Sequence, residues 1–316
     1  MLNLPTSVKI FEQAPRDGLQ DVGDFVPTAK KAALVRLLAG SGVAGISVTS
    51  FVHPKWVPQM ADAEDLLREL GPAPAGVVYS AVAPNEKALL RLIELPEEIR
   101  PSRVGVPFSA SETFQRRNVN RTTEETLREI GRLVALGHKH GVEVTSAISM
   151  AFGCPYEGDV PASAVVRAAD ALWTEGVRSI SLADTTGTSN PLMIKEICGA
   201  VIGELPEADI GLHIHDSRGM GLACVLAALE VGITRLDGSA GGIGGCPYAR
   251  GARGNIATED LVHMLHEMGI HTGVDLGKIL QAAKFIDEEL GLPVASQVYR
   301  AGPVRHEPAP EADTCD

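Results

Sequence analysis

Two histidines separated by one residue stand out in the second half of the chain. His213 and His215 lie in a β-rich run, so both imidazoles project from one face while Ile214 points the other way. Two imidazoles directed to one point suit a metal ion, but a hydrogen-bonded structural pair has the same spacing. The pair alone leaves both interpretations open.

Asp17 and Asn255 provide oxygen donors that would complete a metal site. Asp17 follows the first β-rich run, and Asn255 precedes a helical segment that begins near Thr258. Each also has an ordinary explanation, because both residue types are common in turns and before helices. Two nitrogens, one carboxylate and one amide oxygen leave about two octahedral positions open, which suits Mg²⁺ or Mn²⁺ better than a closed zinc site. We therefore predict a divalent metal, Mg²⁺ or Mn²⁺, bound by Asp17, both histidines and Asn255.

Two further side chains are candidate reactive groups beside this site. Arg16 immediately precedes the candidate aspartate, so its permanent charge can stabilise an oxyanion near the metal, or it can pair with Glu12 or Asp184. Cys246 lies in the glycine-rich run 241–248, and a thiol on a loop that folds over a ligand can relay a proton. A single cysteine is more often inert, so this alternative also stays open.

The elements that must position these residues alternate regularly. Eight β-rich runs, each followed by a segment of helical period, are typical of parallel β/α units. The predicted strands are 8–13, 45–49, 76–81, 104–108, 143–148, 179–183, 211–215 and 235–238, and the helices begin near Thr28, Ala61, Asn85, Thr123, Ala162, Pro191, Gly219 and Thr258. Eight repeats favour a closed (β/α)8 TIM barrel over an open sheet, and no GxGxxG turn follows the first strand. Such a barrel gathers catalytic residues at the C-terminal ends of its strands.

The length of 316 residues fits one barrel of roughly 250 residues with extensions. We predict a domain of residues 1–294, in which 275–290 form an additional C-terminal helix, followed by a flexible tail, 295–316, that is too poor in apolar residues to pack. Only 4% of residues are aromatic, so the core must consist mainly of Ala, Val, Leu and Ile.

Charge and cysteine content narrow the class of protein. A net charge of -12 argues against binding to nucleic acid or to an anionic membrane, since both need a basic surface. The five cysteines include no CxxC pair, which favours a reducing compartment. With no long apolar stretch and no targeting pattern at the N-terminus, we predict a cytoplasmic protein.

Seven motifs together resemble those of the 3-hydroxy-3-methylglutaryl-CoA lyases, a branch of the metal-dependent barrel family that also contains isopropylmalate and homocitrate synthases. The likeness covers roughly residues 8 to 290. It rests on APRDGLQ (14–20), TSFVHPKWVPQMAD (49–62), GCPYEG (153–158), SLADTTG (181–187), HIHD (213–216), GGIGGCPYA (241–249) and GNIATEDLVHML (254–265). The synthases share the Arg-Asp and His-x-His elements but not the phrases around 54–60 or Cys246, which favours the lyase branch.

The resemblance implies a role for each candidate residue. The family's metal ligands fall on Asp17, His213, His215 and Asn255, its oxyanion-stabilising arginine on Arg16, its loop cysteine on Cys246 and another active-site acid on Asp184, while His213 would also act as the base.

The implied reaction is cleavage of 3-hydroxy-3-methylglutaryl-CoA (HMG-CoA), or of a close homologue, to acetyl-CoA and acetoacetate or the corresponding keto product. We expect an acyl-CoA substrate and a homodimer or higher homo-oligomer. Candidate cations for the CoA phosphates are Lys55, Arg116, Arg117 and Arg253, each of which is otherwise a solvated surface charge.

One position departs from the family pattern. Where the lyases carry a glutamate at the end of the second strand, this chain has Ser47. A serine is neither a carboxylate base nor a charged partner for Arg16. The alternative function is therefore a catalytically impaired or redirected homologue that still binds metal and CoA.

Overall fold

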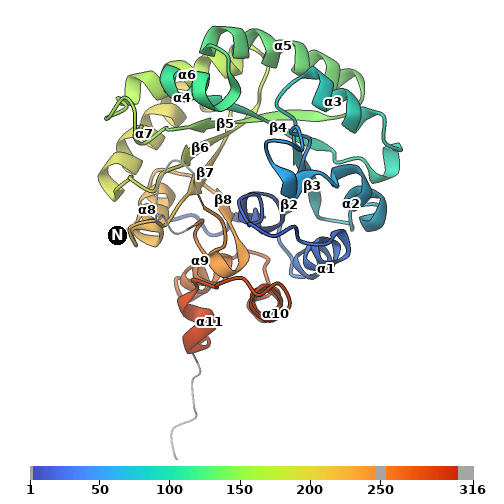
Figure 1. Cartoon of the computed structure of the whole chain (residues 1–316). Helices are drawn as coiled ribbons and strands as arrows, with labels where there is room; N and C mark the ends of the chain where they lie inside the picture. The colour runs from blue at the N-terminus through green and yellow to red at the C-terminus, as the bar shows by residue number, and fades with distance from the viewer. Residues whose placement is uncertain (1–2, 246–253, 305–316) are drawn as a thin grey trace, which may run out of the picture.

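Eight parallel strands close into a barrel in the order β1 to β8, and β8 pairs back onto β1. This computed structural model describes residues 3–245 and 254–304, and its helices surround the barrel (Figure 1). The (β/α)8 fold predicted from the sequence is confirmed. Because the barrel is closed and parallel, every strand delivers its C-terminal end to the same rim.

All eight predicted strands are present, with ends shifted by no more than two residues. The strands are β1 (Lys9–Glu12), β2 (Gly45–Ser50), β3 (Val78–Val82), β4 (Arg103–Ser109), β5 (Glu143–Ser149), β6 (Ser179–Asp184), β7 (Asp209–Ile214) and β8 (Arg235–Gly238). The α-helices are α1 (Thr28–Ala39), α2 (Ala63–Leu70), α3 (Glu86–Ile93), α4 (Glu112–Val119), α5 (Thr123–Lys139), α6 (Ala162–Thr174), α7 (Pro191–Glu204), α8 (Gly221–Glu230), α9 (Thr258–Glu267), α10 (Leu276–Glu288) and α11 (Gln297–Ala301). Short helical turns are η1 (Ala14–Gly18), η2 (Pro58–Met60), η3 (Glu97–Ile99) and η4 (Ala240–Gly242).

The core is aliphatic, as the composition predicts. All residues of β2 and β6 are buried, because these strands face the barrel interior on one side and the helices on the other. Beyond the eighth unit, α10 packs against α1 and η4 and so closes the ring of helices beside β1 (Figure 1). The additional C-terminal helix is thereby confirmed.

One helix in the connection from β4 to α5 is missing from the sequence prediction. α4 begins after Ser111, whose hydroxyl accepts a hydrogen bond from the backbone N–H of Phe114 at 3.1 Å. It is only eight residues long and strongly polar, so its apolar period is too weak to read from the sequence.

The C-terminal segment also differs from the prediction. Asp260 on α9 accepts hydrogen bonds from the Ser296 hydroxyl and from the backbone N–H groups of Gln297 and Val298, at 2.7 to 2.9 Å. These bonds cap α11 and hold it beside α9, with Val298 buried. The prediction of an unpacked tail from residue 295 is therefore wrong for α11, whereas residues 305–316 lie outside the described part.

None of the helices in the described part of the chain has the length and apolar character that a membrane crossing requires.

Candidate metal centre

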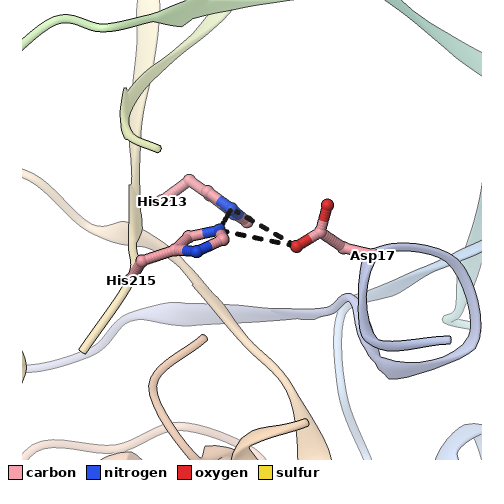
Figure 2. Close-up of side chains that lie close together, drawn as sticks. All are labelled: Asp17, His213 and His215. Carbon is pink, nitrogen blue, oxygen red and sulfur yellow. Dashed lines mark hydrogen bonds and ion pairs between the residues drawn. The ribbon is translucent and has the colours of Figure 1, made fainter. Parts of the chain in front are cut away.

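Asp17, His213 and His215 meet at the C-terminal rim of the barrel. Figure 2 shows the two imidazoles of β7 and its end facing the carboxylate of Asp17. The two histidine Nε2 atoms are 3.2 Å apart, and they lie 3.5 Å (His215) and 4.0 Å (His213) from Asp17 Oδ2. Among residues 3–245 and 254–304, these three form the only cluster of His, Cys, Asp and Glu side chains close enough to share an ion.

The distances within this cluster fit a metal ion. Ligand atoms at about 2.1 Å from an ion stand roughly 3.0 Å apart as neighbours in an octahedron and roughly 3.4 Å apart in a tetrahedron. The observed separations of 3.2 to 4.0 Å are close to those values, so a small inward movement of the side chains suffices.

Asp237 on β8 fixes the orientation of His213 and is a residue that the sequence analysis missed. Its Oδ2 lies 3.0 Å from His213 Nδ1, so Nδ1 carries the proton and Nε2 presents its lone pair to the cluster. Both ring nitrogens of His213 are thus engaged. The predicted second role of His213, as the base that takes a proton from the substrate, stays a prediction.

The charges of the cluster reinforce one another. Burial opposes ionisation of Asp17, but Arg16, His215 and His213 together outweigh it and lower the pKa of this carboxyl well below its usual value. Burial likewise opposes the charged form of His213, yet the hydrogen bond and charge of Asp237, with a contribution from Asp17, raise its pKa. The site therefore presents an ionised carboxylate to a cation.

Asp17 is positioned by a single π-helical turn that follows β1 directly. In η1 the backbone N–H of Gly18 donates to the carbonyl of Gln13 at 3.1 Å, which accommodates an extra residue in the turn and is frequent at functional sites. Gly18 has no room for a side chain, because a Cβ there would lie 2.7 Å from Ile243.

Glu12 joins this turn to η4 and to the start of α9, which both follow β8, the strand next to β1. Its Oε1 accepts hydrogen bonds from the backbone N–H groups of Ala14 and Ala240 at 2.9 Å, and its Oε2 accepts one from the Thr258 hydroxyl at 2.7 Å. Burial raises the pKa of Glu12 to about 7, although these hydrogen bonds partly offset the effect. One buried carboxyl thus joins η1, η4 and the start of α9.

Asn255 lies against the cluster because its segment pairs with the ends of β7 and β8. It forms an antiparallel bridge with His215, and Ile256 donates to the carbonyl of Ile214 at 3.2 Å. The amide Nδ2 of Asn255 donates to Asp17 Oδ2 at 2.8 Å. Coordination through Oδ1 requires the amide to turn by about 180°, an orientation that hydrogen-bond networks alone assign.

Arg16 points into the site, where Glu12 and Asp184 are not its partners. Its guanidinium donates to Asp17 Oδ1 at 2.5 Å, to Gln13 Oε1 at 2.9 Å and to Ser47 Oγ at 3.3 Å. The hydroxyl of Ser47 therefore takes a hydrogen bond where the family pattern has a carboxylate.

Asp184, the last residue of β6, forms hydrogen bonds to the backbone of the turn that follows it. Its two carboxylate oxygens accept the backbone N–H groups of Thr188 and Ser189, each at 2.9 Å. The side chain caps the turn that follows β6, and it does not belong to the cluster of Asp17 and the histidines. Cys246 lies outside the described residues.

A cavity of about 460 Å³ adjoins the rim beside η1. It is lined by Gly18, Asp21, Val22, residues 242–245, Gly254, residues 292–295 and Arg300. Sequence reasoning missed Arg300, because an arginine near the C-terminus carries no local signal of its packing. Of the predicted CoA cations, Arg116 pairs with Glu112, whereas Lys55 and Arg117 lie beside aromatic rings and Arg253 falls outside the described residues.

Comparisons with known proteins agree with this geometry. The HMGL-like family model matches residues 7–286. The hydroxymethylglutaryl-CoA lyase YngG of Bacillus subtilis is 42% identical over 302 residues, which cover 94% of this chain and 99% of the relative, and the mitochondrial enzyme of Rattus norvegicus is 42% identical over 95% of this chain and 91% of its own. A crystal structure of an HMG-CoA lyase from B. subtilis superposes with a TM-score of 0.90 at 41% identity, covering 94% of this chain and 98% of that one. An HMG-CoA lyase from Acinetobacter baumannii, in complex with coenzyme A and 3-methylmalate, superposes with a TM-score of 0.89 at 36% identity, covering 96% and 98%.

Proposed function

This chain belongs to the HMGL-like family, and from that premise we propose that it is a metal-dependent carbon–carbon lyase that cleaves HMG-CoA to acetyl-CoA and acetoacetate. The resemblance seen in its motifs is confirmed. The observation that carries the proposal is the cluster of Asp17, His213 and His215 at the barrel rim, with the guanidinium of Arg16 directly beside it.

The metal would be held by Asp17, by Nε2 of each histidine and, after its amide turns, by Asn255. When bound, a divalent ion supplies Lewis acidity that lowers the pKa of the substrate hydroxyl and polarises a carbonyl. The mixed nitrogen and oxygen donors and the room for further ligands favour Mg²⁺ or Mn²⁺.

The reaction splits HMG-CoA into acetyl-CoA and acetoacetate, and overall no proton is gained or lost. The C2–C3 bond breaks and its electron pair stays on C2, while the C3 hydroxyl gives its proton to His213, the base that the resemblance implies, and becomes the ketone of acetoacetate. The enolate of acetyl-CoA then takes up a proton at C2. Negative charge develops on the thioester oxygen, where Arg16 is placed to donate a hydrogen bond.

Delivery of the proton to C2 is assigned to Cys246 on the glycine-rich loop. This assignment rests on the family motif alone, because the residue lies outside the described part of the chain. Asp184 would act indirectly, by holding the turn after β6 through its two backbone hydrogen bonds.

The acyl-CoA substrate would approach through the cavity beside η1. This cavity lies next to Gly18 and Gly244, and it carries Arg300 as a cation for an anionic group. The homologue from A. baumannii binds coenzyme A, which supports an acyl-CoA substrate here.

The alternative, an impaired or redirected binding protein, is not favoured. Ser47 removes a charged partner from Arg16, but the guanidinium keeps three hydrogen bonds and its place beside Asp17. The cluster of Asp17, His213 and His215 is present, and the chain is 42% identical to an HMG-CoA lyase.

A coupled assay for acetoacetate tests the proposal. The purified chain with HMG-CoA and Mg²⁺ or Mn²⁺ should form acetoacetate, and His215→Ala should abolish product formation because one ligand is lost. His138→Ala, which alters an exposed histidine on α5, is the matched control and should retain full activity. Absence of acetoacetate from HMG-CoA, and of acetyl-CoA from homologues with a longer alkyl group at C3, would refute lyase activity.

A homo-oligomer and a cytoplasmic location both stay predictions. The relatives include mitochondrial enzymes as well as a bacterial one. Light scattering of the purified chain measures the first directly.

A further inference from the structure

Gln13, the residue between β1 and η1, touches both halves of the site. It is buried, with 8% of its surface exposed. Its Oε1 accepts a hydrogen bond from Arg16 Nη2 at 2.9 Å, and its Nε2 donates one to Asp237 Oδ2 at 3.1 Å. The same Asp237 oxygen lies 3.0 Å from His213 Nδ1. One amide thus bonds to both the arginine and the carboxylate that orients the histidine.

We propose that Gln13 is a positioning residue, whose amide holds Arg16 toward the substrate and Asp237 toward His213. One side chain thereby fixes the orientation of both the oxyanion-stabilising group and a metal ligand. The part concerning Arg16 rests on the proposed lyase function. The part concerning His213 requires only that the cluster bind a metal.

The chemistry of the three partners explains why an amide stands at this position. A guanidinium only donates hydrogen bonds and an ionised carboxylate only accepts them, so the orientation of the amide between them is determined. A glutamate would repel Asp237, and a lysine would repel Arg16. Among side chains of this length, only glutamine satisfies both partners.

The distances make Gln13 the stronger of the two neutral contacts of Arg16. The bond to Gln13 measures 2.9 Å, whereas the bond to Ser47 measures 3.3 Å, near the limit for a hydrogen bond. The remaining partner, Asp17, is itself a candidate metal ligand. Gln13 is therefore the main neutral group that directs the guanidinium, alongside the ion pair with Asp17.

A double-mutant cycle on metal binding tests the link to His213 without any substrate. Gln13→Met, which keeps the volume and removes both hydrogen bonds, should raise the Kd for Mn²⁺ about 10-fold in an equilibrium measurement, as changes behind a metal ligand commonly do. In an Asp237→Asn background the same substitution should change the Kd less than about 2-fold, because the path to His213 is already broken. Equal effects in the two backgrounds would overturn the link.

Turnover tests the link to Arg16. With Mn²⁺ saturating for every variant, Gln13→Met should lower kcat for HMG-CoA about 10-fold with less than about a 2-fold change in KM, and in an Arg16→Met background it should have no further effect. An unchanged kcat in the single variant would overturn this part. If the wild-type chain forms no acetoacetate, the proposed function fails, while the Mn²⁺ cycle still decides the role of Gln13.

Two further variants separate positioning from folding. Gln115→Met removes the side-chain bond of a buried glutamine to Thr126 outside the barrel, so it should lower stability comparably and leave Mn²⁺ affinity and kcat unchanged. Should Gln13→Met fail to fold, Gln13→Asn keeps the amide but is one methylene too short to span both partners. It is expected to weaken Mn²⁺ binding or turnover, and wild-type values for both would overturn the proposal.

Discussion

The Glu12→Gln variant should become more stable relative to the wild-type protein as the pH rises. Burial raises the pKa of Glu12 from 4.5 to about 7. Below pH 4.5 the carboxyl is protonated in both states; between 4.5 and 7 the unfolded chain releases the proton while the folded chain keeps it. The free energy of unfolding therefore falls across that window and levels off above pH 7.

The magnitude follows from the two pKa values. Each pH unit is worth about 1.4 kcal/mol, so the carboxyl costs the folded state about 3 kcal/mol by pH 8 relative to pH 4.5. A glutamine side chain at this position cannot ionise, and its Oε1 can still accept the N–H groups of Ala14 and Ala240, so the variant escapes this cost. Its lost or weakened hydrogen bonds contribute a difference that does not depend on pH.

Urea unfolding at pH 5.0 and pH 8.5 measures the effect. The stability of Glu12→Gln minus that of the wild type should increase by about 2.5 kcal/mol between the two pH values. Glu98→Gln, at an exposed residue, is the control and should show a constant difference. A pH-independent difference for Glu12→Gln would show that Glu12 is ionised in the folded protein and that the reasoning from burial is wrong.

Three further predictions concern the metal, the β6 turn and the C-terminal helix. Mn²⁺ at about 100 times its Kd should raise the Tm by roughly 4 °C, since that excess contributes about 2.7 kcal/mol of stability. The shift should vanish in His215→Ala, and an equal shift in the variant would place the ion elsewhere. Asp184→Asn should cost about 1–3 kcal/mol in urea unfolding, because an amide cannot accept both N–H groups of Thr188 and Ser189, and an unchanged stability would refute its capping role. Asp260→Ala removes the three hydrogen bonds that cap α11, so amide hydrogen exchange of residues 297–301 should accelerate by about 10-fold or more. Unchanged protection would show that apolar packing alone holds the helix.

The barrel could be predicted because each unit carries its own local signals. Thr28, Thr123, Ala162, Pro191 and Thr258 were predicted as helix starts and are the first residues of α1, α5, α6, α7 and α9. α11 could not be predicted in this way, since its five residues are held by Asp260 on another helix. Such an element depends on tertiary contacts that no local period reports.

The candidate site likewise contains some residues that local spacing predicts and others that depend on contacts distant in the sequence. His213 and His215 could be paired from their spacing, because alternate residues of a strand share a face. The roles of Asp237 and Gln13 could not, since their contact spans 224 positions in the sequence and depends on β8 closing onto β1. The amide orientation of Asn255 depends likewise on what it faces, which in this structure is Asp17.

Adjacent residues at the end of β1 bind different partners at the rim, and both are linked to the metal centre. Glu12 holds the loops that carry Asn255, while Gln13 holds Arg16 and, through Asp237, a metal ligand. A change at either residue should disturb the metal centre. Ser47 lies on β2 and accepts a hydrogen bond from Arg16 at 3.3 Å. It is linked to the metal cluster through that guanidinium, which also bonds to Asp17. The departure from the family pattern at Ser47 therefore acts first on Arg16, the group proposed to stabilise the oxyanion, so we expect it to affect the rate of cleavage more than the metal affinity.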